Sequence, residues 1–168
     1  SVSFVDATET AAVESAIRPE TSLLWMETPT NPLLKLCDLR EIAALAADHG
    51  VRLGVDNTFA SPALQQPLAM GADVVIHSTT KYLNGHSDSI GGALVTNDDA
   101  YAEEVGYLQQ VAMGSMLSPF DAYVVLRGTK TLPLRVQRHD ANAQAVAELF
   151  ADHDRVERDC RYRRCART

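Results

Sequence analysis

The sequence predicts an α/β fold in one domain, with a mainly parallel sheet and flanking helices. Short apolar runs of strand length alternate with segments in which apolar residues recur every three or four positions, and this alternation is typical of layered α/β structures. No internal repeat or low-complexity linker divides the chain. With 168 residues, of which 46% are hydrophobic, the chain is long enough to bury a sizeable core.

The first elements alternate between strand and helix. Residues 1–5 alternate in polarity and predict a strand, and residues 9–17 predict a helix. The run SLLWME at 22–27 is typical of a buried parallel strand. Asp38 and Glu41 form a capping-box pattern that starts the next helix. The apolar face of this helix comprises Leu39, Ile42, Ala43 and Ala46, and Gly50 ends it.

Three more strands follow, at 52–56, 74–78 and 92–96. Between the first two, Ser61 is expected to be the N-cap and Pro62 the first position of a short helical turn that extends to Gly71. The second half is predicted to be helical, and its helices have three signals. One helix has an apolar face at Tyr101, Val105, Leu108 and Ala112 and is capped near Asn97 or Asp98. A second helix starts at Ser118 and Pro119. A third is indicated by a 3.6-residue period at Ala143, Val146, Ala147 and Phe150.

Composition excludes several classes of protein. The chain has 15 basic and 22 acidic residues, a net charge of −7, which argues against nonspecific binding to nucleic acid or to anionic membranes. No apolar run reaches the length of a membrane span, and no signal-peptide pattern is present. Three widely spaced cysteines indicate no disulfide framework, so we expect a cytoplasmic protein.

The chemistry is expected at the carboxyl ends of the strands, where open α/β sheets bind their ligands. Glu27 begins the loop after the first buried strand, Asp56 ends the next strand, and Ser78-Thr79-Thr80-Lys81 follows the third. A carboxylate and an amine therefore reach the same edge of the sheet, with hydroxyls beside the amine.

Other chemistries fit less well. There is no Gly-x-Gly-x-x-Gly turn for a dinucleotide. The stretch RGTKT at 127–131 imitates the end of a P-loop without its upstream Gly, so we interpret it as a helix end capped by Gly128. The stretch GHSDS at 85–89 lacks the closing Gly of a nucleophile elbow. Cys160 and Cys165 with His153 are a weak zinc signal.

Pyridoxal 5′-phosphate (PLP) suits a Lys flanked by hydroxyls with an Asp one crossover earlier. The amine of Lys81 can form a Schiff base with the aldehyde, and Asp56 can keep the pyridine nitrogen protonated. Hydroxyls can donate to the phosphate. These residues alone leave a PLP site as one proposal among several.

Five longer motifs follow one another along the chain. They are ETPTNP at 27–32, VDNTFASP at 55–62, STTKYLNGHSD at 78–88, SPFD at 118–121 and RGTKTL at 127–132. Together they closely resemble the Cys/Met-metabolism PLP enzymes, the trans-sulfuration family. The resemblance extends from residue 1 to about residue 157. It implies a partial large domain of the aspartate-aminotransferase-like fold, fold type I, at 1–157. The basic stretch at 158–168 departs from the family and is expected to be a disordered tail.

The resemblance implies roles for individual residues. Lys81 matches the Schiff-base lysine and Asp56 the carboxylate at the pyridine nitrogen. Ser78 and Thr80 match the hydroxyls on the cofactor phosphate.

Further positions carry weaker implications. Asn31 matches the loop amide that faces the cofactor's phenolic oxygen or the substrate carboxylate, and Thr58 is expected near the ring face. For His77, His86 and Asp88 a structural role in holding the lysine segment is the better interpretation.

The implied activity is elimination or replacement at the γ carbon of homoserine-derived or sulfur amino acids, of the cystathionine γ-synthase or γ-lyase type, through a Lys81 aldimine. A homoserine sulfhydrylase is an alternative, and so is a catalytically inactive fragment with part of the cofactor site. Full-length members are dimers of dimers, more than twice this length. A phosphate held away from water needs a countercharge, and Lys81 is committed to the aldehyde. The nearest other cations in the sequence are Lys35 and Arg52, and Arg52 lies at the wrong end of its strand. Little activity is therefore expected from this chain alone.

Overall fold

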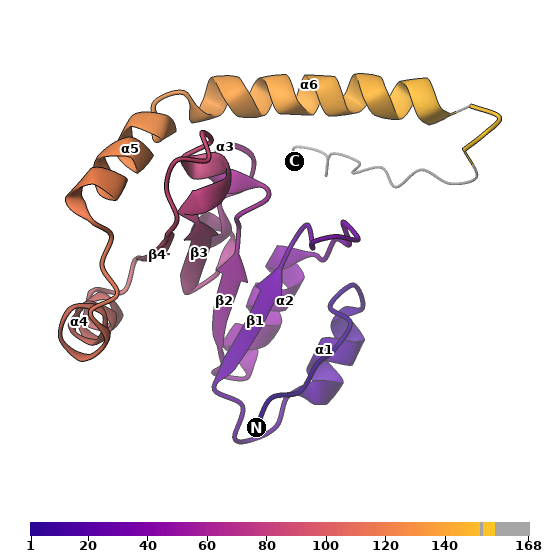
Figure 1. Cartoon of the computed structure of the whole chain (residues 1–168). Coiled ribbons are helices and arrows are strands. Elements are labelled where there is room, and N and C mark those ends of the chain that lie inside the picture. The colour runs from indigo at the N-terminus through magenta and orange to yellow at the C-terminus, as the bar shows by residue number, and fades with distance from the viewer. Residues whose placement is uncertain (152, 157–168) are drawn as a thin grey trace.

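Four strands form one sheet in which the order in space follows the order along the chain (Figure 1). The computed structural model describes residues 1–151 and 153–156. The first three strands are parallel, and the fourth runs antiparallel to the third, which confirms a mainly parallel sheet. The strands are β1 (Leu23–Glu27), β2 (Arg52–Asp56), β3 (Val74–Ser78) and β4 (Gly92–Thr96), as the apolar runs predict.

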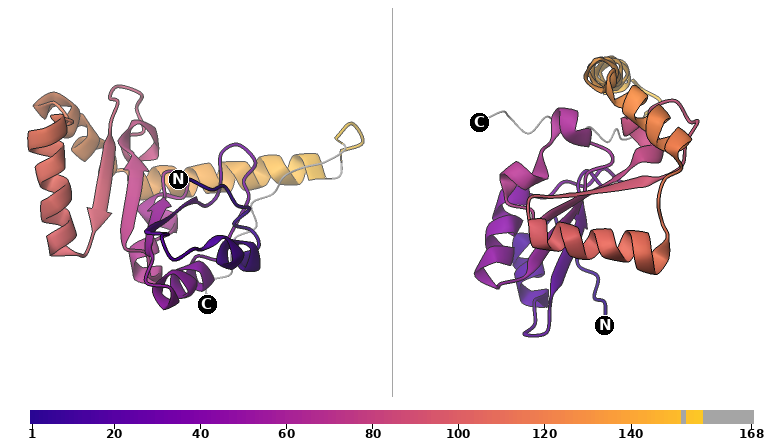
Figure 2. Two further views of the ribbon diagram at one scale, coloured as in Figure 1. Left: turned by 90° about the horizontal axis from the view of Figure 1, so that it is seen from below. Right: turned by 90° about the vertical axis from the view of Figure 1, so that its left-hand side faces the viewer.

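Helices flank this sheet on both sides. In chain order they are α1 (Thr10–Ala16), α2 (Leu39–Asp48), α3 (Ser61–Leu64), α4 (Asp99–Tyr107), α5 (Pro119–Thr129) and α6 (Leu132–Ala151). A 3₁₀ turn, η1 (Pro67–Met70), and two π-type turns, η2 (Thr79–Leu83) and η3 (Leu108–Met113), join them. Figure 2 shows α2 on one side of the strands and α4 on the other, with α6 running past the carboxyl ends of β1–β3. None of the helices in the described residues is long and apolar enough to cross a membrane.

The core lies between α2 and one face of the sheet. The predicted apolar face of α2 is buried against alternate residues of the strands, namely Met26, Leu53, Val55 and Val75. Ile42 and Leu53 are both 1% exposed, and complete burial of such side chains contributes about 1.5–3 kcal/mol each. Asp38 caps α2 by accepting from the N–H groups of Arg40 and Glu41. The carboxylate of Glu41 accepts instead from Thr10 Oγ1 at 2.7 Å, which joins α1 to α2.

The opposite face of the sheet is more open. Leu23 and Trp25 of β1 are 47% and 55% exposed, and Trp25 lies over Gly54, where a Cβ would be 3.1 Å from the indole ring. The β4 side of this face is covered by α4, whose Ala102 and Val105 lie near Ile76 and Leu94. The last residues of β1, β2 and β3 on this face are Glu27, Asp56 and Ser78.

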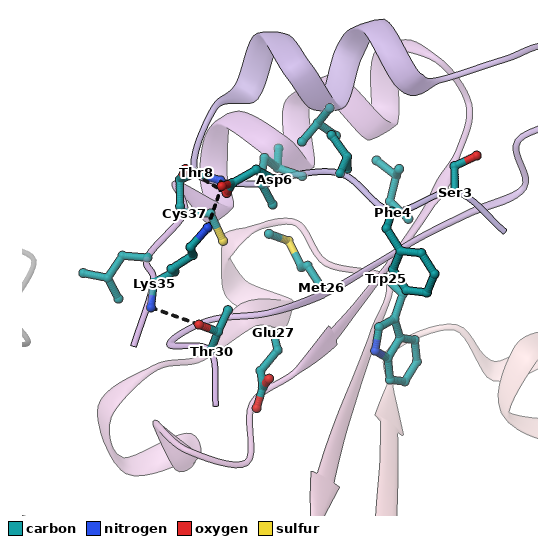
Figure 3. Close-up of a pocket in the computed structure, with 16 residues that line it drawn as sticks. Ser3, Phe4, Asp6, Thr8, Trp25, Met26, Glu27, Thr30, Lys35 and Cys37 are labelled. Carbon is teal, nitrogen blue, oxygen red and sulfur yellow. Dashed lines mark hydrogen bonds and ion pairs between the residues drawn. The ribbon is translucent and has the colours of Figure 1, made fainter. Parts of the chain in front are cut away.

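The predicted strand at 1–5 is wrong. These residues lie outside the sheet, and Phe4 is 98% exposed. Residues 3–8 and β1 both line a hollow of about 320 Å³, and Figure 3 shows Phe4, Asp6 and Trp25 among the side chains around it. Alternating polarity makes a strand only when a neighbouring strand lies within hydrogen-bonding distance, and here β1 pairs with β2 alone.

Gly128 is not a helix cap, which is a second correction. It lies inside α5, whose C-cap is Lys130. The glycine is needed for packing, because a Cβ at this position would overlap the carbonyl oxygen of Asn84. A smaller correction concerns Ser61, which is the first residue of α3 while Ala60 is its N-cap.

The other helix signals are largely confirmed. Asp98 caps α4 and Ser118 caps α5 through their side chains. The stretch predicted as one helix at 101–112 divides after Tyr107 into α4 and η3. The predicted tail at 158–168 lies outside the described residues.

Candidate active site

One cleft at the carboxyl ends of β1–β3 brings all the predicted site residues together. Its volume is about 850 Å³. It is lined by the six predicted residues Asn31, Asp56, Thr58, Ser78, Thr80 and Lys81. Parallel strands end at the same edge, so residues separated by up to 50 positions along the chain meet there. Their individual roles stay predictions.

Two carboxylates enter the cleft side by side. Glu27 and Asp56 are partners in the β1–β2 register. Each accepts a hydrogen bond from the loop that follows it: Asn31 N–H donates to Glu27 Oε2 at 3.2 Å, and Thr58 N–H donates to Asp56 Oδ1 at 3.0 Å. One oxygen of Asp56 therefore caps a turn.

Thr58 joins the ends of two strands. Its Oγ1 accepts from the N–H of Ser78 at 2.8 Å, across the end of the β2–β3 pair. This bond fixes the position of Ser78, whose side chain lines the cleft and is half-buried. The structure thus gives Thr58 a local structural contact, and its predicted place at a ring face is not tested.

Lys81 lies in the turn η2, directly after β3. Its backbone angles, φ −93° and ψ −122°, are not helical and interrupt the turn. Gly85 N–H donates to the Lys81 carbonyl at 2.7 Å, and Asn84 N–H donates to the Thr79 carbonyl at 3.2 Å. The Lys81 side chain is exposed at the cleft.

The hydroxyl of Thr80 fastens this turn to the residue before β4. Thr80 Oγ1 donates to the Gly91 carbonyl at 3.3 Å and accepts from the Gly91 N–H at 3.0 Å. The hydroxyl is thus engaged with backbone, which is the structural alternative to phosphate binding. Ser89 also lines the cleft, and its buried Oγ has no hydrogen-bond partner within the described ranges.

Neither of the two cations considered from the sequence lies in the cleft. Lys35 pairs with Asp6 at 2.6 Å beside the hollow of Figure 3, and this contact together with hydrogen bonds from Thr8 lowers the pKa of Asp6 from 3.8 to about 2. Arg52 stacks on the ring of Tyr101 at 4.2 Å.

Sequence reasoning missed the contribution of α6 to the cleft. Arg135 and His139 line it, and the His139 ring is 5.7 Å from the ring of Tyr82. Both residues follow Lys81 by more than 50 positions, so no local spacing could reveal them.

Asp88 and His86 have the structural role that was favoured for them, while the same role for His77 stays a prediction. His77 is 5% exposed, and burial lowers its pKa. Its Nδ1 has no hydrogen-bond partner in the described part of the chain. Asp88 accepts from the buried Asn84 Nδ2 at 2.7 Å, and His86 Nδ1 lies 2.7 Å from the Asn84 carbonyl.

Residues 1–163 match the family model of the Cys/Met metabolism PLP-dependent enzymes. The chain belongs to this family. Cystathionine γ-synthase of Mycobacterium tuberculosis (strain H37Rv) is 61% identical over 145 residues, covering 86% of this chain and 37% of that protein. Cystathionine β-lyase of Coxiella burnetii is 48% identical over 159 residues, covering 94% of this chain and 41% of that protein.

Solved structures agree with the family assignment. The crystal structure of cystathionine γ-lyase from Lactobacillus plantarum, complexed with L-serine, superposes with a TM-score of 0.90 at 47% identity and covers 93% of this chain. The fold is therefore that of the PLP-dependent trans-sulfuration enzymes, fold type I. The chain spans about 40% of the length of these relatives.

The residues in the cleft fit the family's cofactor. The aldehyde of the cofactor requires an amine, its pyridine nitrogen a carboxylate and its phosphate hydroxyl donors. Groups of all three kinds line this one cleft. The unpartnered Oγ of Ser89 adds a buried polar atom in the same wall. A buried polar atom without a partner is costly in a folded protein, so a bound polar group there would be stabilising.

Proposed function

We propose that the intact protein catalyses elimination or replacement at the γ carbon of a homoserine-derived or sulfur amino acid, as a cystathionine γ-synthase or γ-lyase. The observation that carries this proposal is the meeting of Lys81, Asp56 and Ser78 in one cleft. The printed names of the relatives, which include γ-synthase, γ-lyase and β-lyase, support trans-sulfuration as the class of reaction.

Each residue has a definite task in this proposal. When bound, PLP supplies an electron sink for negative charge at the substrate's α carbon. The amine of Lys81 holds the cofactor and, once released, takes the proton from the α carbon. Asp56 provides the negative charge that favours a protonated pyridine nitrogen. Ser78 donates to the phosphate, and Thr80 does so when its hydroxyl turns from the Gly91 carbonyl.

The γ-synthase, γ-lyase and homoserine sulfhydrylase reactions differ in the acceptor or leaving group at the γ carbon. Assays with cystathionine, with O-succinylhomoserine plus cysteine, and with a homoserine ester plus sulfide would separate them in the intact protein. Production of 2-oxobutanoate from cystathionine would indicate the lyase, and production of cystathionine would indicate the synthase.

This chain by itself is expected to show little turnover. A phosphate dianion held away from bulk water needs a countercharge as well as hydroxyls. Lys35 and Arg52 are engaged elsewhere, with Asp6 and Tyr101, and the guanidinium of Arg135, which lines the cleft, donates to backbone carbonyls. Robust turnover of cystathionine by the isolated chain would contradict this expectation.

Borohydride reduction in the presence of PLP tests the site itself. We expect the pyridoxyl label on Lys81, identified by peptide mapping, and none in the Lys81→Ala variant. Lys35 and Lys130 are the internal controls, since both are exposed and lie outside the cleft lining. A label distributed equally over the three lysines would reject the assignment.

We further propose that the intact protein assembles with other copies of itself and acts in the cytoplasm. Phe120, Tyr123 and Leu126 form an apolar row on α5 and are 69%, 62% and 67% exposed. Such a row is typical of a surface that another protein covers. Sedimentation equilibrium of the intact protein, with a Tyr123→Asp, Leu126→Asp variant for comparison, tests assembly; a wild-type monomer would contradict it. The free, half-buried thiol of Cys37 fits a reducing compartment.

A further inference from the structure

We propose that Arg135 is a positioning residue for Lys81: its guanidinium holds the turn η2 in the conformation that presents the lysine to the cleft. The structural part of this inference stands on hydrogen bonds and packing. The part that concerns reactivity of Lys81 rests on the proposed function.

The turn needs an external donor because it is irregular. The non-helical backbone at Lys81 interrupts the regular ladder of hydrogen bonds. The carbonyl groups after it therefore lack the N–H partners that a regular helix would supply. Gly85 N–H satisfies the Lys81 carbonyl. The carbonyls of Tyr82 and Leu83 follow, in a half-buried environment where an unpaired carbonyl would destabilise the turn.

Arg135 supplies these donors. Its Nη1 donates to the Tyr82 carbonyl at 2.8 Å, and its Nη2 donates to the Leu83 carbonyl at 3.3 Å. Nη2 also donates to the Gly128 carbonyl at 2.8 Å, and Nε donates to Thr131 Oγ1 at 3.1 Å. A guanidinium has five N–H donors in a rigid plane, and four of them are used here. One side chain thus joins η2, the end of α5 and the start of α6.

Two glycines make room for this arrangement. At Gly85, which has φ +77°, a Cβ would overlap the Arg135 guanidinium. At Gly128, a Cβ would overlap the carbonyl of Asn84, the residue that follows η2. The backbone of α5 and the end of the lysine turn are therefore in direct contact, and Arg135 fits against both. This packing supports the same conclusion independently of the hydrogen bonds.

The consequence concerns the geometry of Lys81. Asp56 and Ser78 are fixed by the strands, whereas Lys81 is fixed by the turn. Without Arg135 the turn can relax toward a regular helix, which rotates the lysine relative to the other groups of the cleft. A displacement of about 1 Å is enough to lower the rate of a reaction that needs aligned groups by about 100-fold.

Amide hydrogen exchange on this chain tests the structural part without any cofactor. In Arg135→Ala, we expect the amides of Asn84 and Gly85 to exchange about 10-fold faster, because their bonds close the turn. The amides of α2 should keep their wild-type rates. Arg138→Ala is the matched control, since Arg138 is an exposed arginine on the same helix. Unchanged exchange at residues 84 and 85, or an equal increase in α2, would overturn the proposal.

Labelling of Lys81 by PLP and borohydride tests the reactive part. We expect Arg135→Ala to slow the labelling of Lys81 by about 10-fold while Lys35 is labelled at the wild-type rate. Arg135→Lys should restore part of the rate, since an ammonium can still donate to one or two carbonyls. Gly85→Ala should resemble Arg135→Ala. Equal labelling of Lys81 in wild type and Arg135→Ala would overturn the positioning role. Absence of wild-type labelling at Lys81, with the exchange result intact, would reject the proposed function and leave the role of Arg135 in the turn.

Discussion

On β2, Leu53 and Val55 point to one face of the sheet, and Arg52, Gly54 and Asp56 to the other. The first face is covered by α2 and is nearly dry, with Leu53 and Val55 at 1% and 0% exposure. The second face has an exposed indole at one end and the open cleft at the other. Leu53 and Val55 of this strand therefore stabilise the fold, whereas Asp56 on its other face is presented to the cleft.

Substitutions on the covered face should therefore unfold the protein, whereas those at the cleft should change only its chemistry. Burial on the α2 face contributes to the free energy of folding, and the groups at the cleft contribute little to it. Substitutions of Leu53, Asp56, Thr58 and His77 test that separation.

Leu53→Ala should destabilise the protein by about 2–5 kcal/mol, because it leaves a cavity under α2. Urea unfolding followed by circular dichroism measures this loss. Trp25→Ala on the open face is the control, and it should cost less than half as much although it removes a larger side chain. Equal losses for the two variants would show that the two faces contribute equally to the free energy of folding.

Asp56→Asn should lower kcat of the intact enzyme by about 100-fold, because a neutral amide cannot stabilise a protonated pyridine nitrogen. The stability of the variant should change by less than about 1 kcal/mol, since the amide oxygen can still accept from Thr58 N–H. Steady-state kinetics and thermal unfolding on the same preparation measure both quantities. Equal kcat values would show that Asp56 does not act on the cofactor.

Thr58→Val should destabilise the protein by about 1–3 kcal/mol, because it leaves the Ser78 N–H without an acceptor. Thr58→Ser keeps the hydroxyl and should retain most of the stability. Urea unfolding of both variants measures how much a cleft residue contributes to stability through one hydrogen bond. No difference between Val and Ser would show that the bond contributes nothing.

His77 should make the protein less stable as the pH falls below about 6.5. Burial lowers its pKa in the folded chain from 6.5, so between the two values the unfolded chain binds a proton that the folded chain does not. We expect the loss of stability between about pH 7.5 and about pH 5.5 to be smaller in His77→Gln than in wild type. The exposed histidines are unchanged in both proteins, so an identical pH dependence would exclude His77 as its source.

Local pattern was sufficient for most of the fold. The strands at 52–56, 74–78 and 92–96 have the predicted bounds, since each is an apolar run between turn residues. Residues 1–5 carry a similar pattern but are not a strand, because pairing depends on a neighbour that local sequence cannot supply.

The candidate site divides in the same way. Strand ends and the motif order placed Lys81, Asp56 and Ser78 in one cleft, since parallel topology alone brings such residues together. Arg135 was missed because its contact with Tyr82 spans 53 positions and its guanidinium meets only backbone carbonyls, which any residue type offers. The need for glycine at position 128 could not be predicted for the same reason, because it comes from a contact with Asn84.

The agreement between chain order and sheet order has a kinetic consequence. Each strand joins the one made just before it, so the sheet can form by adding one strand at a time during synthesis. The turn that carries Lys81 is complete once residue 91 is available to bond Thr80. Arg135 emerges from the ribosome more than 40 residues later. We therefore expect the lysine turn to form early and to become rigid only when the first turns of α6 dock.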